Sequence, residues 1–194
     1  MQKILDSNFF NRPTVAVAKD LLGKFLVRRY RSKTIACMIT EVEAYDGRHD
    51  KASHAHRGKT VRNFPMFGTA GQWYVYFTYG MYWMLNIVTR EENYPAAILI
   101  RGVYGISGPG RLTKKLKIDG RFSGLPATAK TGLWIEGRGY RLRDGYIYPL
   151  SPRLRSGLRK DDFQRPLKIK KGPRVGVAYA GRYWAKRHLR FWIV

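Results

Sequence analysis

Apolar and polar residues alternate in several short runs along the chain, and this pattern predicts a protein built mainly on β-strands. Four apolar runs, each bounded by glycine, proline or charged residues, have the length and composition of strands: 25–30, 34–45, 96–103 and 189–194. Two more runs, 72–79 and 82–89, flank Gly80 and Met81 and predict a β-hairpin.

Two segments carry helix signals instead. Residues 12–22 have Pro13 near the first turn and Gly23 after the last, and a second helix is expected from Pro109 to Leu116. Frequent glycines and prolines in 120–172 predict short strands and loops rather than a second core. The expected fold is mixed α+β: a single domain over 1–194, with a curved antiparallel β-sheet core flanked by helices and a protruding β-hairpin.

The composition agrees with one folded domain. The chain has 194 residues, of which 44% are hydrophobic and 14% aromatic, so it can bury a core. Its one cysteine, Cys37, excludes an intrachain disulfide and a multi-cysteine zinc finger. The sequence shows no signal-peptide pattern and no apolar run of bilayer length. We therefore expect an intracellular protein without a membrane partner, in the cytoplasm or nucleoid if the source is prokaryotic.

The charge is strongly basic and unevenly distributed. Lys and Arg number 37 against 13 Asp and Glu, a formal net charge of +24. Residues 1–100 contain 14 basic and 8 acidic side chains, whereas residues 101–194 contain 23 and 5. Such a balance favours a polyanionic partner, most often nucleic acid and less often an anionic membrane surface. A ribosome-associated or simply very soluble basic protein is the alternative.

Two carboxylates occupy one face of a predicted strand. The period of two places Glu41, Glu43 and Tyr45 on the same face of 39–45. Acidic residues are depleted in strands, so a pair of them suggests chemistry. Charges that protect a sheet edge against aggregation are the structural alternative.

Three of the four histidines, His49, His54 and His56, lie within eight residues. A metal site is one interpretation, because imidazole and carboxylate groups are zinc and iron ligands. The spacing matches no regular ligand pair, and a Ser53–His54 hydrolase dyad is disfavoured because adjacent residues rarely face each other. Hydrogen bonding or stacking is the favoured role.

The predicted hairpin is rich in aromatic residues. Tyr74, Tyr76 and Tyr82 alternate with the apolar set, so we expect a face of tyrosines outside the core. In a basic protein such tyrosines can stack on unstacked bases, and one at the hairpin tip can wedge into a duplex. The seven aromatic residues of the run are Trp73, Tyr74, Tyr76, Phe77, Tyr79, Tyr82 and Trp83.

Several ordered blocks together resemble the alkyladenine (3-methyladenine) DNA glycosylase family of the mammalian and Bacillus type. The resemblance runs from about Leu21 to the end of the sequence and is poor over 118–171. Its specificity comes from the order and spacing of the blocks, since no block suffices alone. They are EVEAY (41–45), ASH (52–54), TVRN (60–63) with MF (66–67), YVYFTYGMY (74–82), Asn86, AILIR (97–101), GPGRLT (108–113), GPRVGV (172–177) and LRFW (189–192).

The resemblance implies an enzyme that flips damaged purines out of duplex DNA and hydrolyses the N-glycosidic bond. It implies that Glu43 is the general base that activates water, and that Arg101 holds the water and the phosphate of the flipped nucleotide. Tyr45 and His54 would form walls of the base pocket, with Tyr76 stacking from the opposite side.

Three further roles follow from the same resemblance. Tyr79 would be inserted where the base was, and Asn86 would crowd the exocyclic amine of guanine. The stretch 174–177, chiefly Val177, would supply backbone contacts to the base or water. The implied partner is double-stranded DNA with alkylated or deaminated purines, such as 3-methyladenine, 7-methylguanine or hypoxanthine. We expect a monomer and no metal or organic cofactor.

Two alternatives of other classes remain at this point. One is a non-catalytic nucleic-acid-binding protein that uses a basic surface and the aromatic hairpin. The other is a metal-dependent hydrolase that uses His49, His54, His56 and Glu43.

Overall fold

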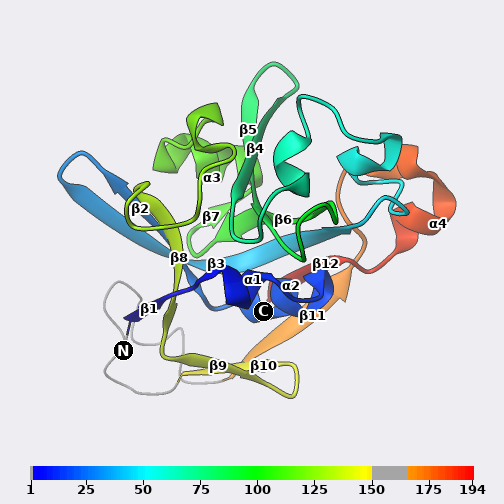
Figure 1. The fold of residues 1–194 in the computed structure, drawn as a ribbon. Helices are drawn as coiled ribbons and strands as arrows, with labels where there is room; N and C mark the ends of the chain where they lie inside the picture. The colour runs from blue at the N-terminus through cyan, green and yellow to red at the C-terminus, as the bar shows by residue number, and fades with distance from the viewer. Residues whose placement is uncertain (1, 150–165) are drawn as a thin grey trace.

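A computed structural model describes residues 2–149 and 166–194, and its strands form one curled antiparallel sheet (Figure 1). The longest strand, β3 (Lys33–Asp46), is central to this sheet. Its first half pairs with β2 (Phe25–Tyr30), and its second half pairs with β6 (Ala96–Val103) and β12 (Arg190–Ile193). Strand β5 (Tyr82–Val88) pairs with β6 and forms a hairpin with β4 (Trp73–Thr78).

The remaining elements extend this framework. The order along the main path of the sheet is β1-β8-β2-β3-β12-β11-β10-β9, and β7 pairs with β6. These strands are β1 (Gln2–Ile4), β7 (Ile106–Ser107), β8 (Leu133–Arg138), β9 (Tyr140–Arg143), β10 (Tyr146–Pro149) and β11 (Leu167–Gly172). The α-helices are α1 (Ser7–Phe10), α2 (Thr14–Leu21), α3 (Pro109–Leu116) and α4 (Gly181–Lys186). The 3-10 turns are η1 (His54–Arg57), η2 (Phe64–Phe67), η3 (Gly120–Phe122) and η4 (Ala178–Ala180).

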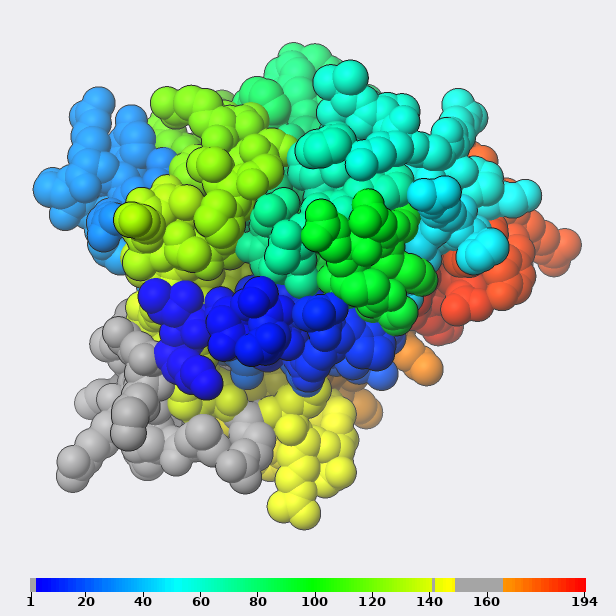
Figure 2. Space-filling view, in the orientation of Figure 1, coloured from blue at the N-terminus to red at the C-terminus, as the bar shows by residue number. Residues whose placement is uncertain are grey.

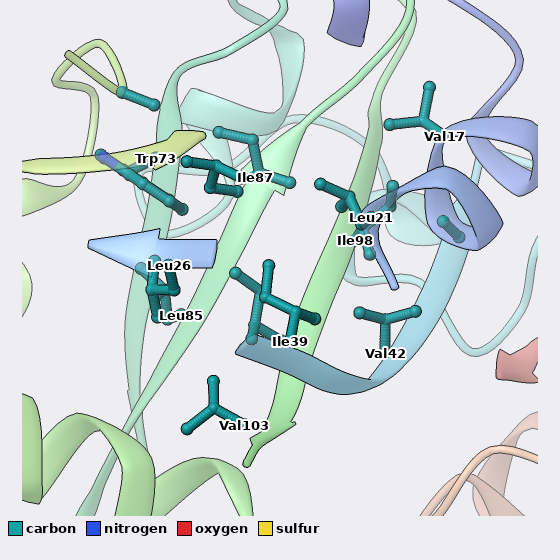
Figure 3. Close-up of a cluster of buried hydrophobic side chains, with 14 of the residues drawn as sticks. Val17, Leu21, Leu26, Ile39, Val42, Trp73, Leu85, Ile87, Ile98 and Val103 are labelled. Carbon is teal, nitrogen blue, oxygen red and sulfur yellow. The ribbon is translucent and has the colours of Figure 1, made fainter. Parts of the chain in front are cut away.

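The main core lies where α2 and the sheet meet (Figure 3). Val17, Ala18 and Leu21 are fully buried, so their spacing places one face of α2 on the core. The indole of Trp73 is also buried, and its Nε1–H donates to the Leu133 carbonyl at 3.1 Å. This bond satisfies the one polar atom of a large core side chain.

The pairing of β3 with β6 is irregular at one place. The register passes from Ile39↔Val103 to Glu41↔Gly102 and then to Val42↔Ile100, so Arg101 has no partner opposite it. Such a bulge bends a strand and redirects the side chain of the extra residue. Here it brings Arg101 toward the carboxylate face of β3.

Most expected elements are confirmed, including the antiparallel sheet, the hairpin strands and the two helices. Within 120–172 the described part holds short strands as expected, but β8 contributes Leu133 and Ile135 to the main core. Residues 150–165 of that segment lie outside the described residues. Protrusion of the β4–β5 hairpin stays a prediction. Among the described residues, no helix has the length and apolar character needed to cross a membrane.

The expected outward tyrosine face needs one correction. Tyr74 is buried, because β4 packs it against η2 in a second cluster that includes Met66, Phe67 and Ala97. The turn at 64–67 covers this part of the sheet, and alternation along β4 could not reveal that cover. Tyr82, in contrast, is exposed.

Gly110 provides a test of the packing of α3 on β5. A Cβ at this position would lie 2.5 Å from Cδ1 of Tyr82, which is closer than real side chains approach. Gly→Ala in a helix normally stabilises by about 1 kcal/mol. We expect Gly110→Ala to reverse this sign and to destabilise by about 1–3 kcal/mol through overpacking.

Urea unfolding measures the effect of this substitution. Gly137→Ala in β8 is the matched control, since the only nearby atom is a backbone oxygen of Lys3 at 4.0 Å. A Gly110→Ala protein as stable as the parent would show that α3 does not pack on Tyr82 in this way.

Candidate active site

The predicted site residues converge on one cleft with a volume of about 760 Å³. Strands β3, β4 and β6, the turn η1 and the segment before η4 together form its walls. Seven of the eight residues singled out from the sequence line it: Glu43, Tyr45, His54, Tyr76, Tyr79, Arg101 and Val177. The eighth, Asn86, lines a cavity of about 30 Å³ that shares Tyr45, His54, Tyr76 and Tyr179 with the cleft.

Glu43 lies at the wall of the cleft with no exposed surface. Its Oε2 accepts a hydrogen bond from the Tyr45 hydroxyl at 2.9 Å, and its Oε1 accepts one from the Val175 backbone N–H at 2.7 Å. Arg101 Nε lies 3.5 Å from Oε1. The carboxylate is therefore fixed by two hydrogen bonds and one ion pair that come from three separate parts of the chain.

Burial raises the pKa of Glu43 above its usual value, because desolvation disfavours the charged form. Arg101, the Val175 N–H and the Tyr45 hydroxyl act in the opposite direction and lower this pKa. The result is a carboxylate with raised basicity beside an open cleft, which suits proton abstraction.

Glu41, the other glutamate of β3, pairs with two arginines. Its Oε1 accepts a hydrogen bond from Arg101 Nε at 3.0 Å. Arg190 Nε also lies 2.8 Å from this oxygen, as an ion pair whose N–H direction does not form a hydrogen bond. Glu41 thus holds Arg101 beside Glu43. This contact favours a structural role for Glu41 over the protection of a sheet edge against aggregation.

The Tyr45 ring forms a wall whose rear face is covered by an arginine. The guanidinium carbon of Arg174 lies 4.7 Å from the ring centroid, and the Arg174 side chain has no exposed surface. Arg174 is not among the residues that line the cleft, so its guanidinium covers the face of the ring that points away from the cleft. Tyr45 is therefore fixed from behind and free to stack on a planar group in the cleft.

Arg174 belongs to the stretch 174–177 expected to supply backbone contacts, but no role for its side chain follows from the sequence. Its guanidinium pairs with both oxygens of the buried Asp50 and donates to the Ala44 carbonyl at 2.9 Å. The next residue, Val175, provides the N–H that binds Glu43. The ion pair therefore attaches the segment after β11 to β3 and places this N–H. The GPRVGV block carried the signal, but spacing alone could not show which backbone group would face Glu43.

Val177 itself is buried, and its side chain lines the cleft. The hydrogen bond from this segment to Glu43 comes from Val175, two residues earlier. A backbone contact from Val177 to a base or water stays a prediction.

His54 and two tyrosines form an aromatic corner. His54 Nδ1 lies 2.8 Å from the Tyr74 hydroxyl oxygen, and the imidazole meets the Tyr76 ring edge-to-face at a centroid distance of 4.6 Å. Burial, with a smaller effect from Arg62, lowers the pKa of His54 to about 4. His54 is therefore neutral at pH 7, as a stacking or hydrogen-bonding wall requires.

The histidine segment does not assemble a metal-ligand set. His56 Nδ1–H donates to the Arg48 carbonyl at 2.9 Å, while His54 bonds to Tyr74. Within residues 2–149 and 166–194, no three His, Cys, Asp or Glu side chains are grouped so as to hold an ion. The contacts that these histidines make are hydrogen bonds to the protein.

Asn86 lies on β5 at the floor of the small cavity. Its Nδ2 donates to the carbonyls of Tyr74 at 3.0 Å and Met84 at 3.2 Å. These two bonds to backbone carbonyls fix the orientation of the Asn86 side chain.

Tyr79 lies at the tip of the β4–β5 hairpin and is 78% exposed. Its φ of +52° is a left-handed conformation that a bulky residue rarely adopts, and Gly80 follows with φ +65°. Its neighbour Met81 is also exposed. An exposed aromatic ring at the edge of the cleft is the placement that insertion into a duplex needs.

Comparisons with known proteins agree on one family. The family model described as methylpurine-DNA glycosylase matches residues 8–107. A relative from Methanocella arvoryzae is 38% identical, with coverage of 92% of this chain and 86% of that protein. Another, from Legionella pneumophila strain Paris, is 40% identical and covers 100% of this chain and 95% of its own length. Both carry the provisional name 3-methyladenine DNA glycosylase, as does a 42% identical Wolbachia relative that covers 84% of this chain and 96% of its own length.

The Asp50–Arg174 pair yields a prediction for stability. Asp50→Ala would leave the fully buried Arg174 guanidinium without its counter-charge, so the free energy of unfolding should fall by about 3–5 kcal/mol. Urea unfolding followed by tryptophan fluorescence measures this loss.

The control for this prediction is Glu91→Ala. Glu91 pairs with Arg90 on the surface, so its loss should leave the unfolding midpoint nearly unchanged. Equal effects of the two substitutions would contradict the structural role of the buried pair.

Proposed function

Because the chain belongs to the methylpurine-DNA glycosylase family, we propose that it hydrolyses the N-glycosidic bond of damaged purines in duplex DNA, as the first step of base excision repair. The observation that carries this proposal is the buried Glu43 carboxylate beside Arg101 in a cleft walled by tyrosines. Such a group is suited to activating water next to a planar base.

Access to the base requires flipping. A purine within the duplex is out of reach, so the nucleotide must leave the stack at a cost of a few kcal/mol, which is smaller for damaged or mispaired bases. The exposed Tyr79 ring fills the vacated space and offsets part of this cost. The net charge of +24 supplies the sequence-independent attraction to phosphates.

The flipped base lies between Tyr45 on one side and Tyr76 with His54 on the other. Each aromatic contact with a base is worth about 1–3 kcal/mol. Asn86, fixed on the floor, excludes the 2-amino group of normal guanine, which adenine and hypoxanthine lack. The proposed substrates are alkylated or deaminated purines such as 3-methyladenine, 7-methylguanine and hypoxanthine. Because 7-methylguanine keeps the 2-amino group, it should be excised more slowly than the other two.

Chemistry takes place at C1′ of the flipped nucleotide. Glu43 takes a proton from water, and the oxygen of that water forms the new bond to C1′. The N-glycosidic bond breaks, and its electron pair leaves with the purine, which gives a free base and an abasic sugar. The Glu43 carboxylate also stabilises the positive charge that develops on the sugar, and Arg101 positions the water and the phosphate.

Non-catalytic binding is the second candidate, and the same carboxylate separates it from catalysis. A protein that only binds DNA gains nothing from a buried carboxylate, which repels phosphates and costs desolvation energy.

Glu43→Gln tests the catalytic assignment. The amide cannot accept a proton from water, so excision should fall by at least about 100-fold, the scale of general-base catalysis. Lesion binding should be largely kept because the shape is unchanged. Single-turnover excision from a hypoxanthine duplex and binding to the same duplex measure the two properties.

Glu41→Gln is the matched variant on the same strand. It touches Arg101 but not the proposed water position, so it should reduce excision far less than Glu43→Gln does. Equal losses would mean that the two carboxylates act as a unit or that the assignment is wrong.

Tyr45→Phe tests the electrostatic control of Glu43. The tyrosine hydroxyl stabilises the charged carboxylate, so its loss should raise the pKa of Glu43 further. A general base works only when ionised, so the rate falls as the pH drops through this pKa. The acidic limb of the pH–rate profile should move to higher pH by about one to two units, because a hydrogen bond to a charged group is worth about 1.5–3 kcal/mol.

Tyr76→Phe is the control for this profile, since Tyr76 gives Glu43 no hydrogen bond. Single-turnover rates on the hypoxanthine duplex between pH 5 and 8 provide the profiles. An acidic limb that stays in place in Tyr45→Phe would remove Glu43 as the titrating base.

A further inference from the structure

A line of exposed cations runs from the cleft along α3. The helix begins at Pro109, which lines the cleft, and it buries Leu112 and Leu116 against the sheet. Its solvent face carries positive charge without interruption by a carboxylate. The exposed cations of α3 and the residue after it are Arg111, Lys114, Lys115 and Lys117.

The far end of α3 is tied to β2. Arg28 Nε donates to the Leu116 carbonyl at 3.2 Å, which joins the last turn of the helix to the strand. The turn between β2 and β3 follows directly and carries three exposed cations, Arg29, Arg31 and Lys33. We call the cations of α3 and of this turn together the α3 track.

The charges of the track are almost free of acidic partners. Residues 104–131 contain one carboxylate, Asp119, which already holds Arg121 at 2.8 Å, and residues 28–36 contain none. Arg31 and Lys33 form no ion pair with any residue of the described ranges. The Arg31 guanidinium lies 5.4 Å from the Tyr30 ring centroid, so this cation is partly ordered before it meets a ligand.

The distance between the turn and the cleft matches a repeat of duplex DNA. Lys33 and Glu43 lie ten residues apart on β3, which at ~3.3 Å per residue gives about 33 Å measured along the strand. One helical turn of B-DNA is roughly 34 Å. A DNA strand that contacts the protein at the lesion therefore approaches it again one helical turn away, near the β2–β3 turn of the protein.

The figures show where the β2–β3 turn lies. In Figure 1 it extends to the left of α3, away from β9 and β10 at the bottom of the view. In Figure 2 the same turn is the light-blue projection at the left edge, apart from the yellow residues at the bottom.

From these observations we propose that the α3 track binds the phosphate backbone of the duplex flank, with Arg31 and Lys33 contacting it about one helical turn from the flipped nucleotide. The inference rests on the proposed function for the position of the lesion. The track binds by charge alone, so it contributes to affinity and salt dependence but not to the chemical step.

The test is a double substitution, Arg31→Gln with Lys33→Gln, which removes two charges from the turn. On long undamaged duplex DNA, the slope of log K against log[salt] should become less steep by about 1.8, at about 0.9 for each lost phosphate contact. On a duplex with 20 base pairs on both sides of one hypoxanthine, binding should weaken by about 10- to 30-fold at 0.15 M salt. All proteins carry Glu43→Gln in the binding assays, so that the lesion is not removed.

Asymmetric duplexes locate the contact. Shortening one flank of the hypoxanthine duplex to five base pairs removes the DNA that would reach the turn, so the double variant should then bind like its parent. Shortening the other flank should leave the 10- to 30-fold loss intact. Arg31→Lys alone should retain the salt slope, since a point charge suffices for a phosphate.

The matched control is Lys168→Gln with Lys170→Gln on β11, which changes the charge by the same amount on exposed strand residues. It should alter neither the salt slope nor the flank dependence. An equal loss in this control, an equal loss on both asymmetric duplexes, or no loss at all would overturn the proposal.

Excision assays distinguish a failure of the α3 track proposal from a failure of the proposed function. With Glu43 intact, the Arg31 and Lys33 variants should excise hypoxanthine at the parental single-turnover rate when protein is saturating. If the parent itself fails to excise, the proposed function fails. The salt slope on undamaged DNA still tests the track in that case.

Discussion

Glu43 can remain charged while buried only because its two oxygens are met by Tyr45, Val175 and Arg101. An isolated buried carboxylate would take up a proton instead, because desolvation penalises the charge by several kcal/mol. The three donors come from β3, from the segment after β11 and from the bulged position of β6. The curl of the sheet is therefore not incidental to the site, since it brings strands that are distant in sequence to one carboxylate.

The position of the Val175 N–H depends in turn on a buried ion pair between Arg174 and Asp50. Arg174 and Asp50 have no exposed side-chain surface, and the same guanidinium supports the rear of the Tyr45 ring. One ion pair thus fixes both a hydrogen bond to the carboxylate and a stacking wall. A buried pair of this kind adds little to net stability, but it defines one arrangement, because breaking it leaves an uncompensated charge.

Much of the sheet could be predicted from local pattern, and the residues of the cleft were implied by the family resemblance, but contacts that close over long range could not be predicted. The apolar runs located β2, β3, β6 and the hairpin, because strand periodicity is a local property. The burial of Tyr74 could not be read from the alternation along β4, because η2 covers that part of the strand. The role of the Arg174 side chain depends on Asp50, which lies 124 residues earlier. The hydrogen bond from the Val175 N–H to Glu43 depends on the backbone path of a turn, which residue types do not encode.

The cations proposed to attract DNA and the carboxylates proposed to perform the chemistry lie in different parts of the sequence. Four of the 13 acidic residues lie in 41–50, at or near the site, while cations dominate the second half of the chain. Exposed carboxylates at the site would repel DNA phosphates at short range. Glu43 and Asp50 avoid this because they are fully buried, and Glu41 does so because Arg101 and Arg190 cover it. Burial thus does two things at once: it raises the basicity of Glu43 and removes its charge from the face that a phosphate backbone would approach.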